Sequence, residues 1–185
     1  SSGALSAMTF VVTHISAVAA TLIWVIIEWL HRGKPTMFGA ATGAIAGLAT
    51  ITPASGFLGP MSALLIGLAA GTVCYISLNI KNRLGYDDSL DAFGVHGIGG
   101  ILGTLALGLF AQKAINPAGA DGLFFGNPKL FVSQLIAIAV TVVYSFVVTA
   151  IMLKVLDITI GLRVDDESEV VGLDISQHGE SGYTL

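Results

Sequence analysis

Residues 35–80 read PTMFGAATGAIAGLATITPASGFLGPMSALLIGLAAGTVCYISLNI and contain no charged side chain. A helix that crosses a bilayer needs about 20 mostly apolar residues, so this run is too long for one crossing. The segment Thr52-Pro53-Ala54-Ser55-Gly56 interrupts it, and a proline followed closely by a glycine breaks a helix. We therefore predict two helices here, over about 37–51 and about 60–81.

Three further uncharged runs predict the other helices. They cover residues 1–27, 92–111 and 130–153. With their flanking residues they predict helices over about 5–31, about 88–112 and about 128–160. The last would be ~50 Å long, with Gln134 its only strongly polar residue in that run, so we expect it to face lipid. The expected fold is an all-α integral membrane region over 1–160, with five transmembrane helices, followed by a tail over 161–185.

The composition agrees with a membrane protein. Hydrophobic residues make up 54% and charged residues 11% of the chain, whereas an ordinary soluble domain carries roughly 25% charged residues. This balance excludes a soluble globule and a disordered chain. A nucleic-acid-binding protein needs a basic surface, and the net charge here is −4, so we expect no nucleic-acid partner.

The basic residues predict how the chain crosses the membrane. Lys113 and Lys129 fall on the side that holds the start of the chain and the break near Pro53. The opposite side holds the other six of eight: Arg32, Lys34, Lys81, Arg83, Lys154 and Arg163. The positive-inside rule makes that side cytoplasmic. We expect a multi-pass protein of the cell membrane (inner or plasma) with a cytosolic C-terminal tail. Because Ser1 is preceded by no methionine or signal peptide, we also expect a longer parent polypeptide.

The helix over 37–51 is unusually short and rich in glycine. Its length of roughly 22 Å is less than the ~30 Å hydrocarbon core of a bilayer. Gly39, Gly43 and Gly47 recur every fourth residue and form a small-residue face that lets another helix approach closely. Short or interrupted spans are typical of transporters, although helix packing alone explains the pattern equally well.

His96 is the ionisable residue that lies deep in a predicted span. With a helix starting near Asp88, it would lie about 12 Å into the membrane, where an ionisable side chain is costly and marks a functional site by default. Gly97 and Gly100 leave bare backbone beside it, where a helix or a small solute can approach. Burial would favour the neutral imidazole, which can relay a proton. The alternative is a structural histidine bonded to a neighbouring helix.

The other candidate groups point to no enzyme, metal site or cofactor. His14, in the first helix, suits packing or an interhelical hydrogen bond, and His31 suits a solvated turn. The four histidines are too dispersed for metal ligation, and no P-loop, dinucleotide fingerprint or serine–histidine pattern is present in the sequence. Cys74 lies in an apolar run, so we expect a small buried side chain.

Three acidic residues, Asp87, Asp88 and Asp91, cluster at the start of the fourth predicted helix. Acidic side chains there cap free N–H groups and complement the helix dipole. The alternative is a vestibule for cations. Lys81 and Arg83 are close enough in sequence to pair with these carboxylates.

Four stretches, in order along the chain, resemble the ammonium transporter/methylammonium permease/Rhesus superfamily. Residues 86–97 (YDDSLDAFGVHG) are similar to the tenth span of that family. Residues 43–48 (GAIAGL) and 52–56 (TPASG) resemble the eighth span and its exit. Residues 28–29 (EW) and 32–35 (RGKP) resemble the end of the seventh, and residues 161–180 resemble the cytosolic C-terminal region.

The resemblance implies that the chain supplies spans seven to eleven of an eleven-helix protomer built from inverted repeats, in a homotrimer. It implies that His96 is the second of two pore histidines. Around it the implied pore positions are Phe93, Gly97 and Gly100, and the implied structural or vestibule positions are Thr52, Pro53, Asp87, Asp88 and Asp91. The first pore histidine and the aromatic gate belong to the half of the family pattern that this chain lacks.

The implied activity is ammonium transport through a narrow hydrophobic pore, with methylammonium as an analogue. Ammonium would lose its proton at the outer mouth and cross as ammonia, because stripping water from a cation costs more than aromatic contacts return. Electroneutral and electrogenic transport both stay open. The alternatives are an ammonium sensor that signals through the tail, and a membrane fragment that completes the pore of a partner.

The tail is expected to be regulatory. Acidic residues from Asp165 to Glu169 can begin a short helix, and Gly172 can end it. The resemblance implies docking of the tail onto cytosolic loops and a P-II-type nitrogen-regulatory protein that plugs the pore mouth. The positions that carry this expectation are Arg163, Glu167, Gly172, Asp174 and His178.

Overall fold

The structure, a computed structural model, describes residues 2–182. The described residues form helices, turns and loops and contain no strand. The chain divides into two compact units, Ser1–Ala139 and Val140–Leu185. The expected tail over 161–185 is described up to Gly182, and the remainder lies outside the described residues.

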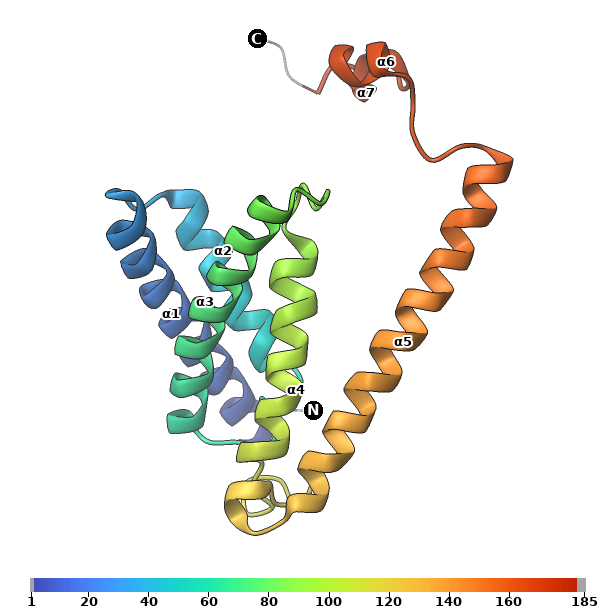
Figure 1. Ribbon diagram of the computed structural model, residues 1–185. Helices are drawn as coiled ribbons and strands as arrows, with labels where there is room; N and C mark the ends of the chain where they lie inside the picture. Colours follow the sequence, from blue (N-terminus) through green and yellow to red (C-terminus); the bar gives the residue numbers. More distant parts are fainter. Residues whose placement is uncertain (1, 183–185) are drawn as a thin grey trace. The chain divides into compact units, whose positions relative to one another are not determined.

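The helices lie close to the predicted ranges (Figure 1). They are α1 (Ala4–Arg32), α2 (Met37–Ile51), α3 (Pro60–Leu84), the π-helix η1 (Phe93–Gly97), α4 (Ile98–Phe110), the 3₁₀ turn η2 (Leu123–Phe125), α5 (Pro128–Thr159), α6 (Asp166–Val171) and α7 (Leu173–Ser176). In the described part, four helical segments are long and apolar enough to cross a membrane: α1, α3, α5 and the continuous Phe93–Phe110. With 15 residues, α2 is the shorter apolar helix that its sequence predicts.

The first unit is organised around α1, which packs against both α2 and α3 through glycines. A Cβ atom on Gly47 of α2 or on Gly67 of α3 would lie 2.5 Å from the same Ser16 carbonyl oxygen of α1. The Ser16 hydroxyl also donates a hydrogen bond of 2.9 Å to the carbonyl of Gly47. The glycines at every fourth residue of α2 thus allow the close helix packing that we predicted from them, because small residues let helix backbones approach closely.

The break between α2 and α3 is a tight turn, and it also contacts the loop that follows α4. After α2 the chain turns through residues 52–57, and Pro60 begins α3 at the first turn, where proline is favoured. The backbone N–H of Gln112, just after α4, donates to the carbonyl of Phe57 at 2.8 Å. Gly103 of α4 lies against the backbone of Thr50. The break is therefore packed against α4.

The fourth helix begins later than its sequence predicts. We expected a helix from about Asp88, but helical structure starts at Ala92, because Asp91 adopts a left-handed backbone conformation with φ 56°. A non-glycine residue in that region cannot continue a right-handed helix. His96 therefore lies on the first full turn of the segment rather than two turns into it.

The long helix α5, which we expect to face lipid, is not buried by the rest of the described residues. The structure describes all of its residues, and none of them is buried. Its first turns still contact α4, where Gly108 lies against Phe131. Helix and apolar composition together suit a hydrocarbon environment, since every backbone group is bonded within the segment.

Candidate functional site

The candidate site is built around the π-helix η1. At its end the N–H of Ile98 donates to the carbonyl of Phe93, five residues earlier, which defines a π turn. Such turns inside α-helices lie frequently at functional sites. Gly94 and Val95 are buried against the bundle, whereas Phe93 and His96 are exposed. η1 therefore presents Phe93 and His96 outward from α1, α2 and α3.

Gly97 and Gly100 play different parts on this segment. A Cβ atom on Gly97 would lie 2.8 Å from the ring of Phe93, so Gly97 makes room for that ring. A Cβ atom on Gly100 would have nothing within 4 Å, so Gly100 adjoins open space. Phe93 and His96 are both exposed, and Gly100, four residues after His96, has open space beside it. These three positions define an open face, which we call the His96 face.

Asp88 caps the segment that carries His96. Its carboxylate accepts hydrogen bonds from the backbone N–H groups of Ala92 at 2.9 Å, Phe93 at 3.0 Å and Gly94 at 3.4 Å. The first N–H groups of a helix have no partner within the helix, and a carboxylate there also complements the helix dipole. Capping, one of the two readings of the acidic cluster, is therefore seen for Asp88.

Lys81, near the end of α3, contacts two of the three acidic residues before η1. Its ammonium group forms an ion pair with the carboxylate of Asp91 and donates to the backbone carbonyl of Asp88 at 2.9 Å. The pairing that the sequence predicts is thus present for Asp91. Asp87 lies apart from it, because its carboxylate accepts from the hydroxyl of Ser89 at 3.0 Å in an exposed turn.

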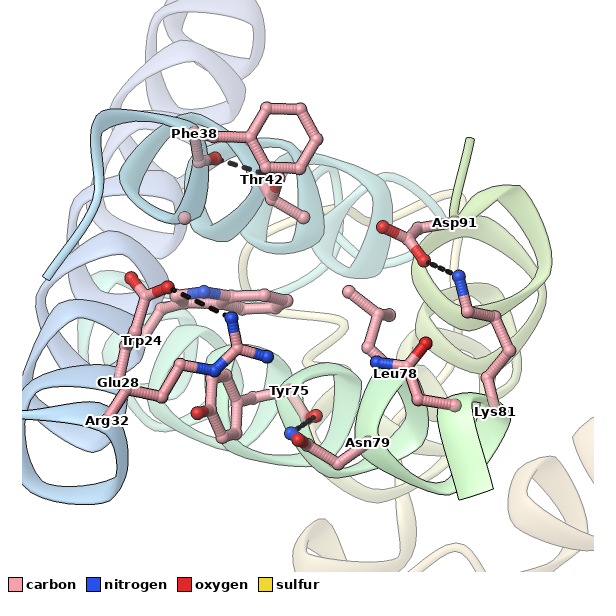
Figure 2. Close-up of a pocket in the computed structure, with 12 residues that line it drawn as sticks. Trp24, Glu28, Arg32, Phe38, Thr42, Tyr75, Leu78, Asn79, Lys81 and Asp91 are labelled. Atoms are coloured by element: carbon pink, nitrogen blue, oxygen red, sulfur yellow. Dashed lines mark hydrogen bonds and ion pairs between the residues drawn. The ribbon is translucent and has the colours of Figure 1, made fainter. Parts of the chain in front are cut away.

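A polar cavity of about 200 Å³ lies beside this ion pair (Figure 2). Its walls come from α1, α2, α3 and the turn before η1, and the lining residues include Trp24, Glu28, Arg32, Thr42, Tyr75, Asn79, Lys81 and Asp91. Each carboxylate on its wall has a cation next to it. Glu28 lies 3.9 Å from Arg32, and Asp91 pairs with Lys81. The cavity is therefore polar and close to electrically neutral.

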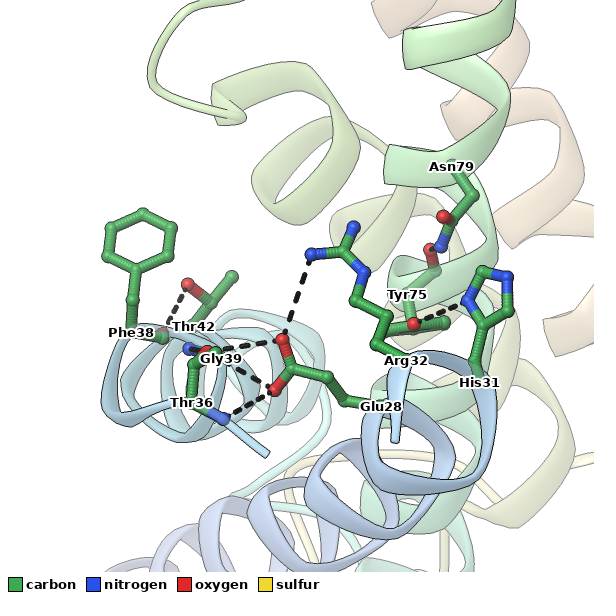
Figure 3. Close-up of polar contacts among 9 residues, drawn as sticks. All are labelled: Glu28, His31, Arg32, Thr36, Phe38, Gly39, Thr42, Tyr75 and Asn79. Carbon is green, nitrogen blue, oxygen red and sulfur yellow. Dashed lines mark hydrogen bonds and ion pairs between the residues drawn. The ribbon is translucent and has the colours of Figure 1, made fainter. Parts of the chain in front are cut away.

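Glu28, which the sequence placed within the family resemblance but without a role, is a buried carboxylate (Figure 3). It accepts hydrogen bonds from the backbone N–H of Thr36 at 3.0 Å and from its hydroxyl at 3.1 Å. The Thr36 hydroxyl oxygen accepts in turn from the N–H of Gly39 at 2.8 Å and so caps α2. The signal in the sequence was the threonine just before α2, a residue type favoured at helix N-caps.

The remaining histidines of the first unit have local partners. Nδ1 of His14 lies 3.1 Å from the carbonyl of Phe10 in the same helix, and its ring centroid lies 4.2 Å from that of Phe10, so of the two expected roles the structure shows packing and no interhelical bond. Nδ1 of His31 lies 2.8 Å from the hydroxyl of Tyr75 on α3. We expected His31 to be solvated. It is exposed, and through this contact it also joins α1 to α3.

The other predicted positions of the first unit lie at the opposite end from the acidic cluster. Thr52 uses its hydroxyl to bond the carbonyl of Leu48 at 2.6 Å, and Pro53 packs toward Gly103. Neither joins the His96 face. Thr50 has a buried hydroxyl that lies beside the Cys74 thiol, and no residue among 2–182 offers it a regular nitrogen or oxygen partner. Its apolar neighbours in α2 gave no signal for this position.

The tail residues form a small helical unit of their own. Asp165 caps α6 by accepting from the N–H of Ser168 at 2.8 Å, and α6 ends at Gly172, as the sequence predicts. Arg163 pairs with Glu169 at 3.1 Å. Asp174 accepts from the N–H of Gly182 at 2.9 Å. Of the other predicted tail positions, Glu167 lies in the first turn of α6, and His178 bonds the carbonyl of Leu173 through its backbone N–H at 3.2 Å.

Two carboxyl groups of this tail, those of Asp165 and Asp174, have pKa values below their ordinary range. Hydrogen bonds from the backbone N–H and the hydroxyl of Ser168 lower the pKa of Asp165. The backbone N–H of Gly182 does the same for the pKa of Asp174. Hydrogen bonds to a carboxylate favour ionisation because they stabilise the charge.

The fold is that of an integral membrane protein, because its long apolar helices are suited to cross a membrane and carry few ionisable side chains. Within the described residues no group of three or more His, Cys, Asp or Glu side chains could hold a metal ion. The Ammonium Transporter Family matches residues 1–183. The chain belongs to the ammonium transporter family, whose members are transporters rather than enzymes.

Individual relatives agree with that assignment. The chain is 47% identical over 175 residues to an ammonium transporter of Bacillus subtilis, covering 94% of this chain and 43% of the relative. It is 51% identical over 174 residues to the ammonium transporter Amt1 of Archaeoglobus fulgidus, covering 94% and 44%. The chain thus spans less than half the length of the curated relatives it matches.

Solved structures show the same fold. Mep2 of Saccharomyces cerevisiae matches with a TM-score of 0.85 at 30% identity, covering 90% of this chain and 39% of Mep2. A structure described as a sensor Amt protein matches with a TM-score of 0.83 at 28% identity, covering 95% and 43%. The all-helical membrane fold expected from the sequence is therefore confirmed.

Proposed function

We propose that this chain contributes one wall of an ammonium-conducting pore, with His96 as its proton-handling side chain. The observation that carries the proposal is the His96 face. An exposed ionisable side chain, an exposed aromatic ring and a glycine backbone that adjoins open space all lie on one helical segment apolar enough to cross a membrane. The family assignment supplies the substrate, ammonium, and the expectation that a second pore histidine lies in the other half of the fold.

The physical chemistry of the solute explains why a histidine suits this place. Moving a bare ammonium ion into an apolar lumen costs far more than moving neutral ammonia. The cation therefore gives up its proton at the outer mouth, and ammonia crosses. A neutral imidazole can both donate and accept a hydrogen bond, so His96 can hold ammonia in the lumen. Transport is electrogenic if the proton also crosses through the histidines and electroneutral if it does not.

The remaining parts of the proposal concern assembly and regulation. We place the complete protein in the cell membrane as a homotrimer, with the end that carries Lys81 and the tail in the cytoplasm. Asp87, Asp88 and Asp91 then lie at the inner mouth, and Thr52 and Pro53 at the outer end. The tail positions Arg163, Glu167, Gly172, Asp174 and His178 contact cytosolic loops and a P-II-type regulatory protein. Deleting residues 164–185 should weaken both transport and capture of that protein, and normal values of both would contradict this regulatory role.

The pore role of His96 is tested on the complete protein in liposomes, by measuring ammonium-driven current and internal pH. His96→Ala should lower or deregulate ammonium flux while the protein still assembles. His14→Ala is the matched control, since His14 is also an exposed histidine on an apolar helix but bonds within its own helix. Unchanged flux and selectivity with His96→Ala would remove His96 from the pore.

The second candidate function is ammonium sensing, and the similarity to a sensor Amt protein favours keeping it. A sensor uses the same site but passes the signal through its cytosolic segment. In cells, a receptor role predicts that a tail deletion abolishes the downstream response to ammonium while flux in liposomes persists. A transporter role predicts that the response follows the flux.

A further inference from the structure

We propose that Lys81 is a positioning residue for His96 and acts through Asp91. This inference rests on the proposed pore function of His96. Lys81 lies near the end of α3, away from the His96 face, and both groups that it contacts belong to the turn leading into η1. It holds that turn at two points, the side chain of Asp91 and the backbone of Asp88.

The ion pair is partly shielded from solvent. The side chain of Lys81 is 13% exposed and that of Asp91 is 16% exposed. Surface ion pairs contribute little because water screens them, whereas breaking a buried pair leaves a charge without compensation. The pair of Lys154 and Asp157 on α5 is the exposed counterpart, at 3.5 Å with side chains 71% and 49% exposed. Replacing Lys81 should therefore change the position of His96 and the transport rate, and replacing Lys154 should change neither.

Asp91 has a reason to need such a partner. Its φ of 56° lies in the left-handed region, which costs energy for any residue with a Cβ, although aspartate tolerates it better than most. A conformation of this kind persists where its surroundings hold it. The N–H of Asp91 donates to the carbonyl of Asp88 at 3.0 Å, but its carboxylate is held by Lys81.

The backbone of Asp91 connects directly to the segment with His96. The carbonyl of Asp91 accepts from the N–H of Val95 at 3.0 Å, the residue before His96. If Asp91 returned to the right-handed region, the helix could extend backwards and η1 could lose its extra residue. A shift of one residue rotates a side chain by about 100° around the helix axis. The His96 side chain would then turn away from its present direction.

The transport test uses four variants of the complete protein in liposomes. Lys81→Met should lower the maximal rate of ammonium transport by roughly tenfold, and Lys81→Arg, which keeps the charge, should restore most of it. Asp91→Asn should match Lys81→Met, and the double variant should be no worse than either, because both changes break one interaction. Lys154→Met is the matched control and should leave the rate within about twofold.

A second measurement reads the position of His96 without using transport. In protein labelled with ¹³C- and ¹⁵N-histidine, the His96 ring signal is identified by its loss in His96→Gln. That signal should shift in Lys81→Met, return toward its original position in Lys81→Arg and stay unchanged in Lys154→Met. An unshifted signal in Lys81→Met overturns the inference even if His96 conducts. A shifted signal together with normal flux in His96→Ala supports the positioning role and contradicts the pore function instead.

Discussion

The carboxylate of Glu28, near the end of α1, accepts two hydrogen bonds from Thr36, the residue that caps α2 (Figure 3). One acidic side chain therefore joins the end of one helix to the start of the next. Glu28 is 3% exposed, whereas the Arg32 side chain beside it is 53% exposed. The hydrogen bonds to Thr36, rather than the long ion pair with Arg32, account for the burial of the charge.

Replacing Glu28 should destabilise this end of the bundle. Glu28→Ala removes the acceptor of both Thr36 donors, and we expect the free energy of unfolding to fall by about 2 kcal/mol. Glu28→Gln keeps an acceptor oxygen and should lose less. Thermal unfolding of the complete protein in detergent measures the difference. Asp157→Ala, at an exposed ion pair, is the control, and equal losses at both sites would contradict the role of Glu28.

Two glycines one turn apart on α4 should respond differently to alanine. A Cβ on Gly103 would collide with the backbone carbonyl of Thr50, so Gly103→Ala should destabilise the fold by about 1–3 kcal/mol. Gly100 has open space around it, so Gly100→Ala should leave stability unchanged. If Gly100 lines the pore, the same substitution should slow methylammonium more than ammonium. Thermal unfolding and flux in liposomes test the two parts separately.

Asp88 should matter for the start of the fourth span more than its exposed neighbour Asp87. Asp88→Ala leaves three N–H groups of residues 92–94 without their acceptor, at a cost of about 1 kcal/mol or more. Hydrogen exchange at these amides should become faster. Asp87→Ala serves as control because its carboxylate bonds only the Ser89 hydroxyl in an exposed turn. Equal exchange rates in both variants would argue against the cap.

The tail should lose helix at acid pH. The folded-state pKa of Asp165 is lowered by its bonds to Ser168, so the cap stabilises α6 fully at pH values above the unfolded pKa. Its contribution should disappear as the pH falls below about 4 and through the folded pKa. Protection of the Ser168 amide against hydrogen exchange reports this loss. Asp165→Asn keeps a capping side chain without a titratable group and should show no such dependence.

The sequence predicted the helices well because charge and apolar length decide where a chain can cross a membrane. The Pro53 break, the glycine face of α2 and the acidic helix start in the tail all follow from local rules. The left-handed Asp91 does not, because its conformation depends on a contact with Lys81 on another helix. The same holds for Glu28, whose burial depends on where Thr36 arrives after the turn.

The site itself could be predicted only in part. A histidine within an apolar span is unusual, so the sequence alone identifies His96 as a candidate. The π turn that orients His96 could not be predicted, since the sequence of residues 93–97 is also compatible with an ordinary α-helix. Gly97 and Gly100 look alike in the sequence, yet one accommodates a ring and the other adjoins open space. Only the three-dimensional packing separates them.

The carbonyl oxygen of Ser16 has a glycine of α2 and a glycine of α3 pressed against it at the same height. A side chain at either glycine would force its helix away from α1. The backbones of α2 and α3 are therefore held close to the same point of α1, and the spacing of these three helices depends on two positions without a side chain. The link from Gly85 to Asp91, which begins and ends with a residue of positive φ, connects α3 to the segment that carries His96, and Lys81 of α3 fixes it at Asp88 and Asp91.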